Sequence, residues 1–176
     1  MKLLSIMIAF LLCASCVRSH DFKPAHLEFV SIENRERGVF YEVRFTSDIE
    51  LLELYWREKG AGRSGQIFIC ALADDTDFSV EHTIAQFGVG LVRRDEEYAG
   101  RDGFGYVADI SFEETRNKRT TSVYLDKKVL AGLLASKKAI PCKVVATASG
   151  YKPYYTESLY IPTGQILEEM HKRKDG

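Results

Sequence analysis

The feature that most constrains this fold is a succession of short apolar segments separated by turn residues. In residues 39–46, apolar and polar side chains alternate from Val39 to Thr46, which is typical of a strand with one buried face. Such regular, short spacing predicts a sandwich or barrel and not alternating βαβ units. Nine candidate strands are found: 26–32, 39–46, 49–56, 66–73, 83–92, 104–112, 120–125, 140–148 and 154–161.

Some of these assignments depend on the flanking residues. The turn-like stretch 33–38 predicts a hairpin between the first two strands, and "SGYKP" (149–153) predicts a turn before the last. Segment 49–56 would also suit one face of a helix. Because Gly60 and Gly62 follow so closely, we expect a strand there.

Two helices interrupt the strand pattern. Asp126 is a candidate N-cap for residues 127–136, and Thr163 for residues 164–173. Each helix places its apolar residues on one face: Val129, Leu130, Leu133 and Leu134 in the first, and Ile166, Leu167 and Met170 in the second.

The predicted fold is therefore all-β: an immunoglobulin-like β-sandwich of about 7–9 strands with one crossover helix and a short C-terminal helix. The resemblance is one of architecture. Trp56 precedes Cys70 where an immunoglobulin domain has its tryptophan after the first cysteine, and Ile140 stands two residues before Cys142 in place of a tyrosine.

The first 19 residues are typical of an export signal. Lys2 is followed by an apolar run, 3–12, which is shorter than the roughly 20 residues needed to span a bilayer. Cleavage is expected before Cys16 or before His20, which leaves one domain, 20–176. The sequence before Cys16 resembles a bacterial lipobox, so we favour lipidation of Cys16.

The two cysteines in the body of the domain are Cys70 and Cys142. An even pair in an exported chain predicts a disulfide. Two buried thiols acting as small apolar side chains are the alternative.

Charge and motifs exclude several functions. With 24 basic and 25 acidic residues, the chain has no basic face for nucleic acid. No catalytic motif is found, and we expect neither an enzyme nor a cofactor. "GAGRSG" (60–65) leads into a strand and not a helix, which favours a hairpin loop over a nucleotide site. "DDTDFSVE" (74–81) lacks the glycine of a calcium loop, which favours a solvated acidic loop.

The leading hypothesis is a non-catalytic domain that binds another protein. It would be a periplasmic or cell-surface lipoprotein, or otherwise secreted, and would meet a membrane only through a lipid at Cys16. The charged loop 93–105 and the segment 150–155 combine tyrosine, arginine and glycine, which favour binding. The candidate contact residues are Tyr98, Arg101, Phe104, Tyr151, Tyr154 and Tyr155.

Two alternatives remain open. If His20 began the mature chain, its amine and imidazole could bind copper with His26 or His82. That arrangement would resemble the histidine brace of copper monooxygenases. The other alternative is a sugar-binding module that uses Tyr151, Tyr154 and Tyr155 as a platform.

Overall fold

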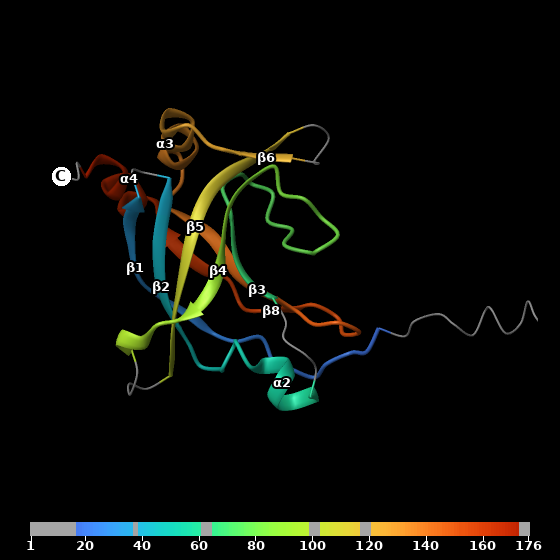
Figure 1. Cartoon of the computed structure of the whole chain (residues 1–176). Coiled ribbons are helices and arrows are strands. Elements are labelled where there is room, and N and C mark those ends of the chain that lie inside the picture. Colours follow the sequence, from blue (N-terminus) through green and yellow to red (C-terminus); the bar gives the residue numbers. More distant parts are fainter. Residues whose placement is uncertain (1–16, 37–38, 61–64, 99–102, 117–120, 173–176) are drawn as a thin grey trace, which may run out of the picture.

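The computed structural model describes residues 17–36, 39–60, 65–98, 103–116 and 121–172. They form nine strands (Figure 1): β1 (Leu27–Glu36), β2 (Phe40–Ser47), β3 (Gly65–Ala71), β4 (Gln86–Arg94), β5 (Phe104–Arg116), β6 (Thr121–Tyr124), β7 (Ala139–Thr147), β8 (Tyr154–Tyr155) and β9 (Leu159–Pro162). The helical elements are α2 (Leu54–Lys59), the 3₁₀ turn η1 (Glu96–Tyr98), α3 (Lys127–Ala135) and α4 (Thr163–His171). No helix within these ranges is long and apolar enough to cross a membrane.

All nine strands belong to a single antiparallel sheet. Its order is β1-β2-β5-β4-β3-β7-β8, with β6 paired to β5 and β9 paired to β7. The all-β class is confirmed, but the immunoglobulin-like sandwich is not. A sandwich needs two separately bonded sheets, whereas the 13-residue β5 pairs with β2, β4 and β6 and joins both halves into one.

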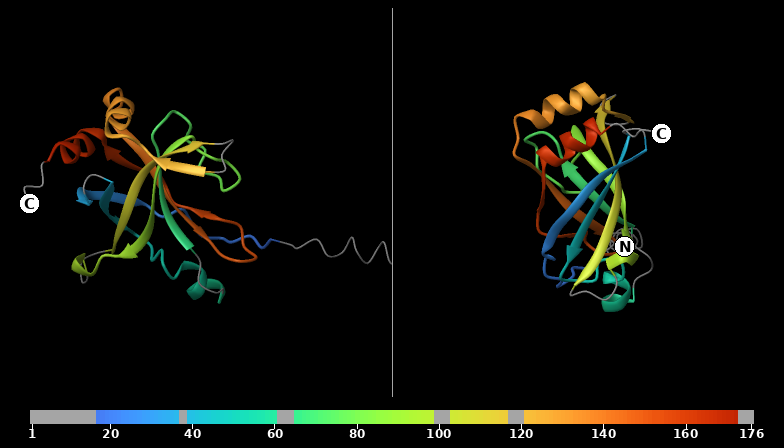
Figure 2. Two further views of the ribbon diagram at one scale, coloured as in Figure 1. Left: turned by 45° about the horizontal axis from the view of Figure 1, so that its top comes forward. Right: turned by 90° about the vertical axis from the view of Figure 1, so that its left-hand side faces the viewer.

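The sheet curls into a nearly closed barrel, visible from the side in Figure 2. Two contacts connect its ends. The Glu157 amide donates to the Ala25 carbonyl at 2.9 Å, and the Asn34 amide donates to the Glu169 carboxylate of α4 at 3.1 Å. These bonds satisfy backbone groups that an open sheet edge would leave exposed.

The core fills the barrel interior, and period-two alternation in the strands creates it. In β2, Tyr41, Val43 and Phe45 point inward and are almost fully buried. Phe45 stacks on Phe68 of β3 with ring centres 5.0 Å apart, which joins the two halves of the sheet across the core.

Helices α3 and α4 cover one end of the barrel (Figure 1). The predicted N-cap of α3 is confirmed, since the Asp126 carboxylate accepts from the Lys128 amide at 2.8 Å. Leu130 and Leu134 are buried as predicted. Val129, which its spacing puts on the same face, is 46% exposed.

The predicted cap of α4 was also wrong. Pro162 occupies the N-cap position and Thr163 is the first helical residue. The Thr163 hydroxyl donates instead to the Lys137 carbonyl, at the turn after α3. The side chain therefore fastens two helical elements together and does not satisfy an amide of its own helix.

The strand predicted over 49–56 is another correction, because the chain forms a loop there and then α2. Leu51, Leu54 and Tyr55 are buried at helical spacing, which outweighs the short distance to the glycines. Gly60 ends α2 in the left-handed conformation with φ of 60°, so it is a helix terminator and not a strand boundary.

The predicted disulfide is confirmed. Cys70 of β3 and Cys142 of β7 are direct partners in the strand register, with Cα atoms 3.9 Å apart, and their sulfur atoms are bonded. Both residues are fully buried.

Candidate protein-binding face

A row of paired residues crosses the outside of the barrel. Each residue of the row is flanked in its own strand by side chains that point into the core, as Glu42 is by Val43 and Ile67 is by Phe68. The row itself therefore faces outward. From β1 to β8 the row reads Glu33, Glu42, Asp109, Leu91, Ile67, Val145 and Tyr155. It is acidic over the first three strands and apolar or aromatic over the rest.

The apolar part continues into the next outward row. We call Ile67 and Ile69 of β3, with Val89 and Leu91 of β4, the apolar strip; they pair as Ile67 with Leu91 and Ile69 with Val89. Ile67, Ile69 and Val89 are half-buried, but Leu91 is 68% exposed. A single exposed leucine is unremarkable, whereas four registered apolar residues make a continuous patch.

The loop between β3 and β4 covers only the upper end of the apolar strip. Phe78 and Ile84 from this loop form a small buried cluster with Ala71, against which Ile69 and Phe87 pack. At the other end of the apolar strip, Leu91 is exposed.

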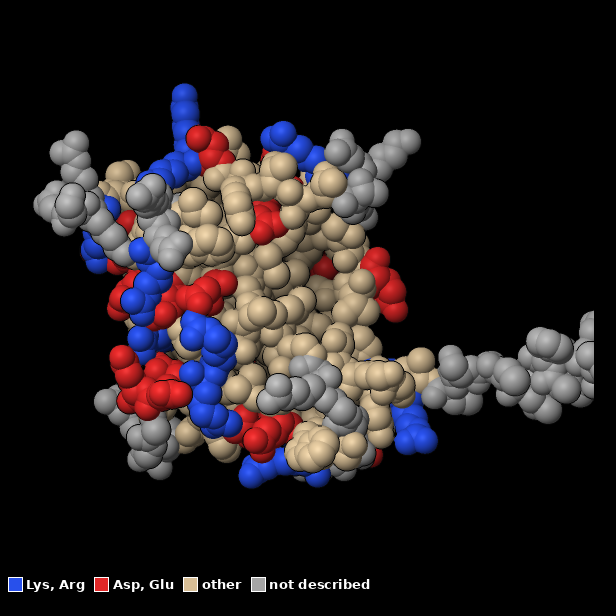
Figure 3. Space-filling model, in the orientation of Figure 1, with Lys and Arg blue, Asp and Glu red and all other residues tan. Residues whose placement is uncertain are grey.

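Arginine and acidic residues border the apolar strip on the β2 and β5 side. This charged flank comprises Arg35, Glu42, Arg44, Arg93 and Asp109. Glu42 accepts from Arg35 at 2.6 Å and from Arg44 Nε at 3.1 Å, and Arg93 is paired with Asp109. Together with Phe40, four of these residues line a surface hollow of about 420 Å³. Figure 3 shows side chains of both signs gathered over β1 and β2, with uncharged side chains over the middle of the face.

The ion pairs keep these charges fixed. Burial by itself would raise the pKa of Glu42, but hydrogen bonds and charges from Arg35 and Arg44 outweigh it and lower the pKa. Arg44 also bonds Asp95 and Glu97, each at 2.9 Å. Because cations and anions alternate and compensate each other, the charged flank has a mixed character and no strong field of one sign.

The structure places the predicted contact residues in different environments. Tyr155 lies on the outward row beside Val145, and its hydroxyl accepts from the Val80 amide at 3.1 Å. Tyr98 in η1 is half-buried against Gly105, and Phe104 packs against the core. Arg101, like the lipidation candidate Cys16, lies outside the described residues.

Tyr154 is a correction, because it is only 1% exposed and cannot contact a partner. Its hydroxyl accepts from the Ala25 amide at 2.6 Å and donates to the Lys23 carbonyl at 3.0 Å, which anchors the N-terminal segment. The three tyrosines considered for sugar binding therefore do not form one platform. Tyr154 points into the barrel, whereas its neighbour Tyr155 points out.

The imidazoles considered for copper binding already have other contacts. His26 pairs with Glu157 at 2.9 Å and His82 with Asp75 at 2.6 Å. His20 Nε2 bonds the Pro153 carbonyl at 3.2 Å, and its ring stacks on Phe22. In the part of the chain that is described, no three His, Cys, Asp or Glu residues are grouped to hold a metal ion.

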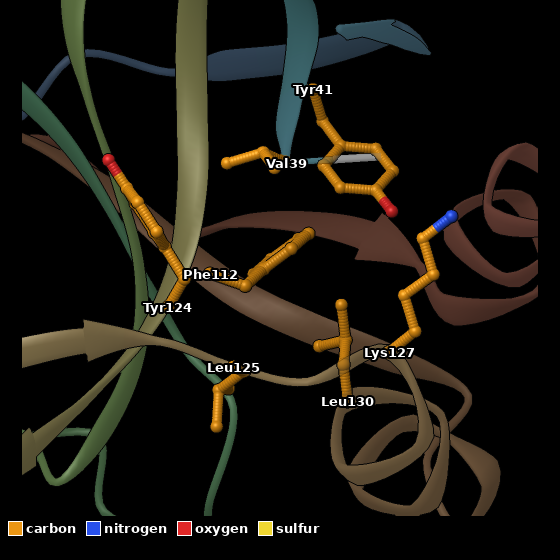
Figure 4. A pocket seen from close by; sticks show the side chains of 7 residues that line it. All are labelled: Val39, Tyr41, Phe112, Tyr124, Leu125, Lys127 and Leu130. Carbon is orange, nitrogen blue, oxygen red and sulfur yellow. The ribbon is translucent and has the colours of Figure 1, made fainter. Parts of the chain in front are cut away.

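A second, much smaller cavity of about 40 Å³ lies beside α3 at the covered end of the barrel (Figure 4). Val39, Phe112 and Leu130 are among its lining residues. The Tyr41 hydroxyl reaches this region and has no hydrogen-bond partner among the described residues. The volume suits a few water molecules and not an organic ligand.

Sequence reasoning missed the apolar strip, although a signal for it exists. In "GQIFICA" (65–71) isoleucines alternate with other apolar residues, so both faces of β3 are apolar. Such a strand is expected to be covered on both sides. The covering layer is present over Ile69 and ends before Leu91.

No family model matches the chain, and no curated protein or solved structure matches it either. The chemistry of the outer face is therefore the basis for assigning a function.

Proposed function

We propose that this protein is an exported, non-catalytic domain that binds another protein through the apolar strip, with the charged flank as the rim of the contact. The observation that carries the proposal is Leu91, 68% exposed among registered apolar neighbours and next to the Arg93–Asp109 pair. An apolar centre with a polar rim is the usual anatomy of a protein interface.

The chemistry of the face also favours one class of partner. The compensated charges of the charged flank suit a partner that offers both signs, and they do not suit a polyanion such as nucleic acid. Glu97, bonded to Arg44, extends the rim into the loop after β4, the loop that carries Tyr98. The partner is accordingly a folded protein with an apolar patch bordered by mixed charges.

The signal-like start of the sequence and the disulfide support export, because disulfides persist in oxidising compartments. Arg18 favours cleavage before Cys16 over cleavage before His20. Its amide donates to the Gly150 carbonyl and its carbonyl accepts from the Lys152 amide, both at 2.9 Å. Cleavage before His20 would remove both bonds. Intact-mass analysis of the exported protein should find acylated Cys16 at the N-terminus; an unmodified chain beginning at His20 would contradict this.

Partner binding is tested with Leu91→Asp and a matched control, Val30→Asp, at an exposed apolar position of β1 that is 50% exposed. A photoreactive residue at position 89 first identifies the partner in the native compartment. Calorimetry then measures the affinity of the purified partner for each variant. Loss of a buried leucine contact and burial of a carboxylate should weaken binding by about 10-fold or more for Leu91→Asp.

The control should bind within about twofold of the unmodified protein, because rim and remote positions contribute little. Equal affinity for all three proteins, or crosslinks that join only two copies of this chain, would overturn the proposal.

A further inference from the structure

Helix α2 lies at the end of the barrel opposite α3 and α4, beside the point where the chain enters the fold (Figure 1). Trp56 of α2 is 64% exposed and is the sole tryptophan of the sequence. The preceding residue, Tyr55, is buried, and its ring lies 5.4 Å from that of Phe22 and 5.7 Å from that of Tyr151. These contacts fix α2 against the N-terminal segment.

Two exposed cations lie at the same place and are joined through the backbone. The Lys152 amide donates to the Arg18 carbonyl, and the Lys152 carbonyl accepts from the Tyr55 hydroxyl at 2.6 Å. Both side chains are exposed. Arg57, next to Trp56, is also exposed and pairs with Glu53 at 3.1 Å. The Trp56 indole therefore lies at one end of the molecule together with Arg18 and Lys152, and with Arg57, which is paired to Glu53.

The lipid proposed at Cys16 would attach the chain to the membrane near this same end. Cys16 precedes the described segment by one residue, and the apolar run 3–12 lies just upstream. Arg18 is held against Gly150 and Tyr151, so the chain enters the described part of the fold beside α2, two residues after Cys16 in the sequence. Such a tether would hold Trp56 and the cations within reach of lipid headgroups.

We propose that this end of the barrel, with Trp56, Arg18 and Lys152 as its contacts, docks on an anionic phospholipid surface. The inference rests on the export and lipid anchor in the proposed function, but it does not involve the apolar strip. Tryptophan favours the headgroup region of a bilayer, and exposed lysine and arginine are attracted to anionic lipids. Docking would leave the apolar strip, on the side of the barrel, open to its partner.

The test uses the exported protein in vesicles of phosphatidylglycerol and phosphatidylethanolamine that carry brominated acyl chains. Because Trp56 is the sole tryptophan, its emission reports docking directly. We expect emission at shorter wavelength and quenching by the bromines. Arg18→Ser with Lys152→Ser should reduce the ratio of docked to undocked protein about 30-fold, since each cation near the surface contributes about 1 kcal/mol.

The matched control is Lys127→Ser with Lys128→Ser, which removes two cations from α3 at the far end and should leave quenching unchanged. Unquenched emission from vesicle-bound protein, or equal effects of the two double variants, would overturn the inference. Leu91→Asp separates the two proposals. It should weaken partner binding by about 10-fold or more and leave the quenching of Trp56 intact. A loss of quenching in that variant would also count against docking through this end.

Discussion

Two buried tyrosines differ in what their hydroxyl groups contact. The Tyr106 hydroxyl donates to the Glu50 carboxylate at 2.9 Å and accepts from the Leu51 amide at 2.7 Å. Glu50 is also paired with Arg94. Tyr41 has no such partner among the described residues, and burial raises its pKa to about 12. The Tyr106 hydroxyl therefore links Glu50 to the Leu51 backbone, whereas Tyr41 contributes apolar packing through its ring.

Removing each hydroxyl tests this difference. Tyr106→Phe leaves the buried Leu51 amide without a partner and should lower the free energy of unfolding by about 1–3 kcal/mol. Tyr41→Phe removes a group that makes no bond and should be neutral or slightly stabilising. Urea unfolding measures both values. Equal losses would show that the Tyr41 hydroxyl has a partner, such as a buried water.

At the scale of elements, the pairing of β4 with β5 depends on a glycine. Gly90 of β4 pairs with Ile110, and a Cβ atom at Gly90 would lie 2.1 Å from the Asp109 carbonyl oxygen. A backbone oxygen cannot move aside as a flexible side chain can. A side chain at this position would therefore force β4 and β5 apart.

The same substitution at two glycines should have opposite effects. Gly90→Ala should lower the free energy of unfolding by about 1–3 kcal/mol or more, because the strands must separate. Gly132→Ala in α3 meets no atom within 4 Å and should raise stability by about 1 kcal/mol through helix propensity. Thermal unfolding of both variants is the measurement. A stable Gly90→Ala protein would mean that β4 and β5 can pair with a side chain between them.

At the scale of the molecule, barrel closure depends on strands that are distant in sequence. The pairing of β3 with β7 joins segments 72 residues apart at the disulfide. The seam between β1 and the last strands is held by the Ala25–Glu157 bond and by α4 through Asn34. These long-range contacts make the nearly closed barrel depend on segments from the whole chain.

The disulfide should contribute about 4 kcal/mol to the free energy of unfolding, because it closes a long loop in the unfolded chain. Chemical unfolding with and without reductant measures this difference. Alkylation of the unfolded, unreduced protein should leave Cys70 and Cys142 unlabelled. Two alkyl groups per chain on these residues would contradict the bond.

Several features of the fold follow from the sequence alone, because their causes are local. Eight of the nine short apolar segments predicted as strands do form strands, with 154–161 containing both β8 and β9, and Asp126 predicts the start of α3. The failures at 49–56 and Thr163 have a physical reason as well. Buried contacts of Leu51 and Tyr55 override the strand pattern in the first, and a bond to Lys137 diverts the hydroxyl in the second.

The tertiary structure alone decided which strands pair and which outward residues meet. The sequence does not indicate that Leu91 lies beside Ile67 on one side and Asp109 on the other, since these pairs join segments 24 and 18 residues apart (91 minus 67, and 109 minus 91). It also does not indicate which of Tyr154 and Tyr155, on opposite faces of one strand, points into the core. Alternation fixes that neighbouring residues face opposite ways, but only the sheet order determines which face is the core.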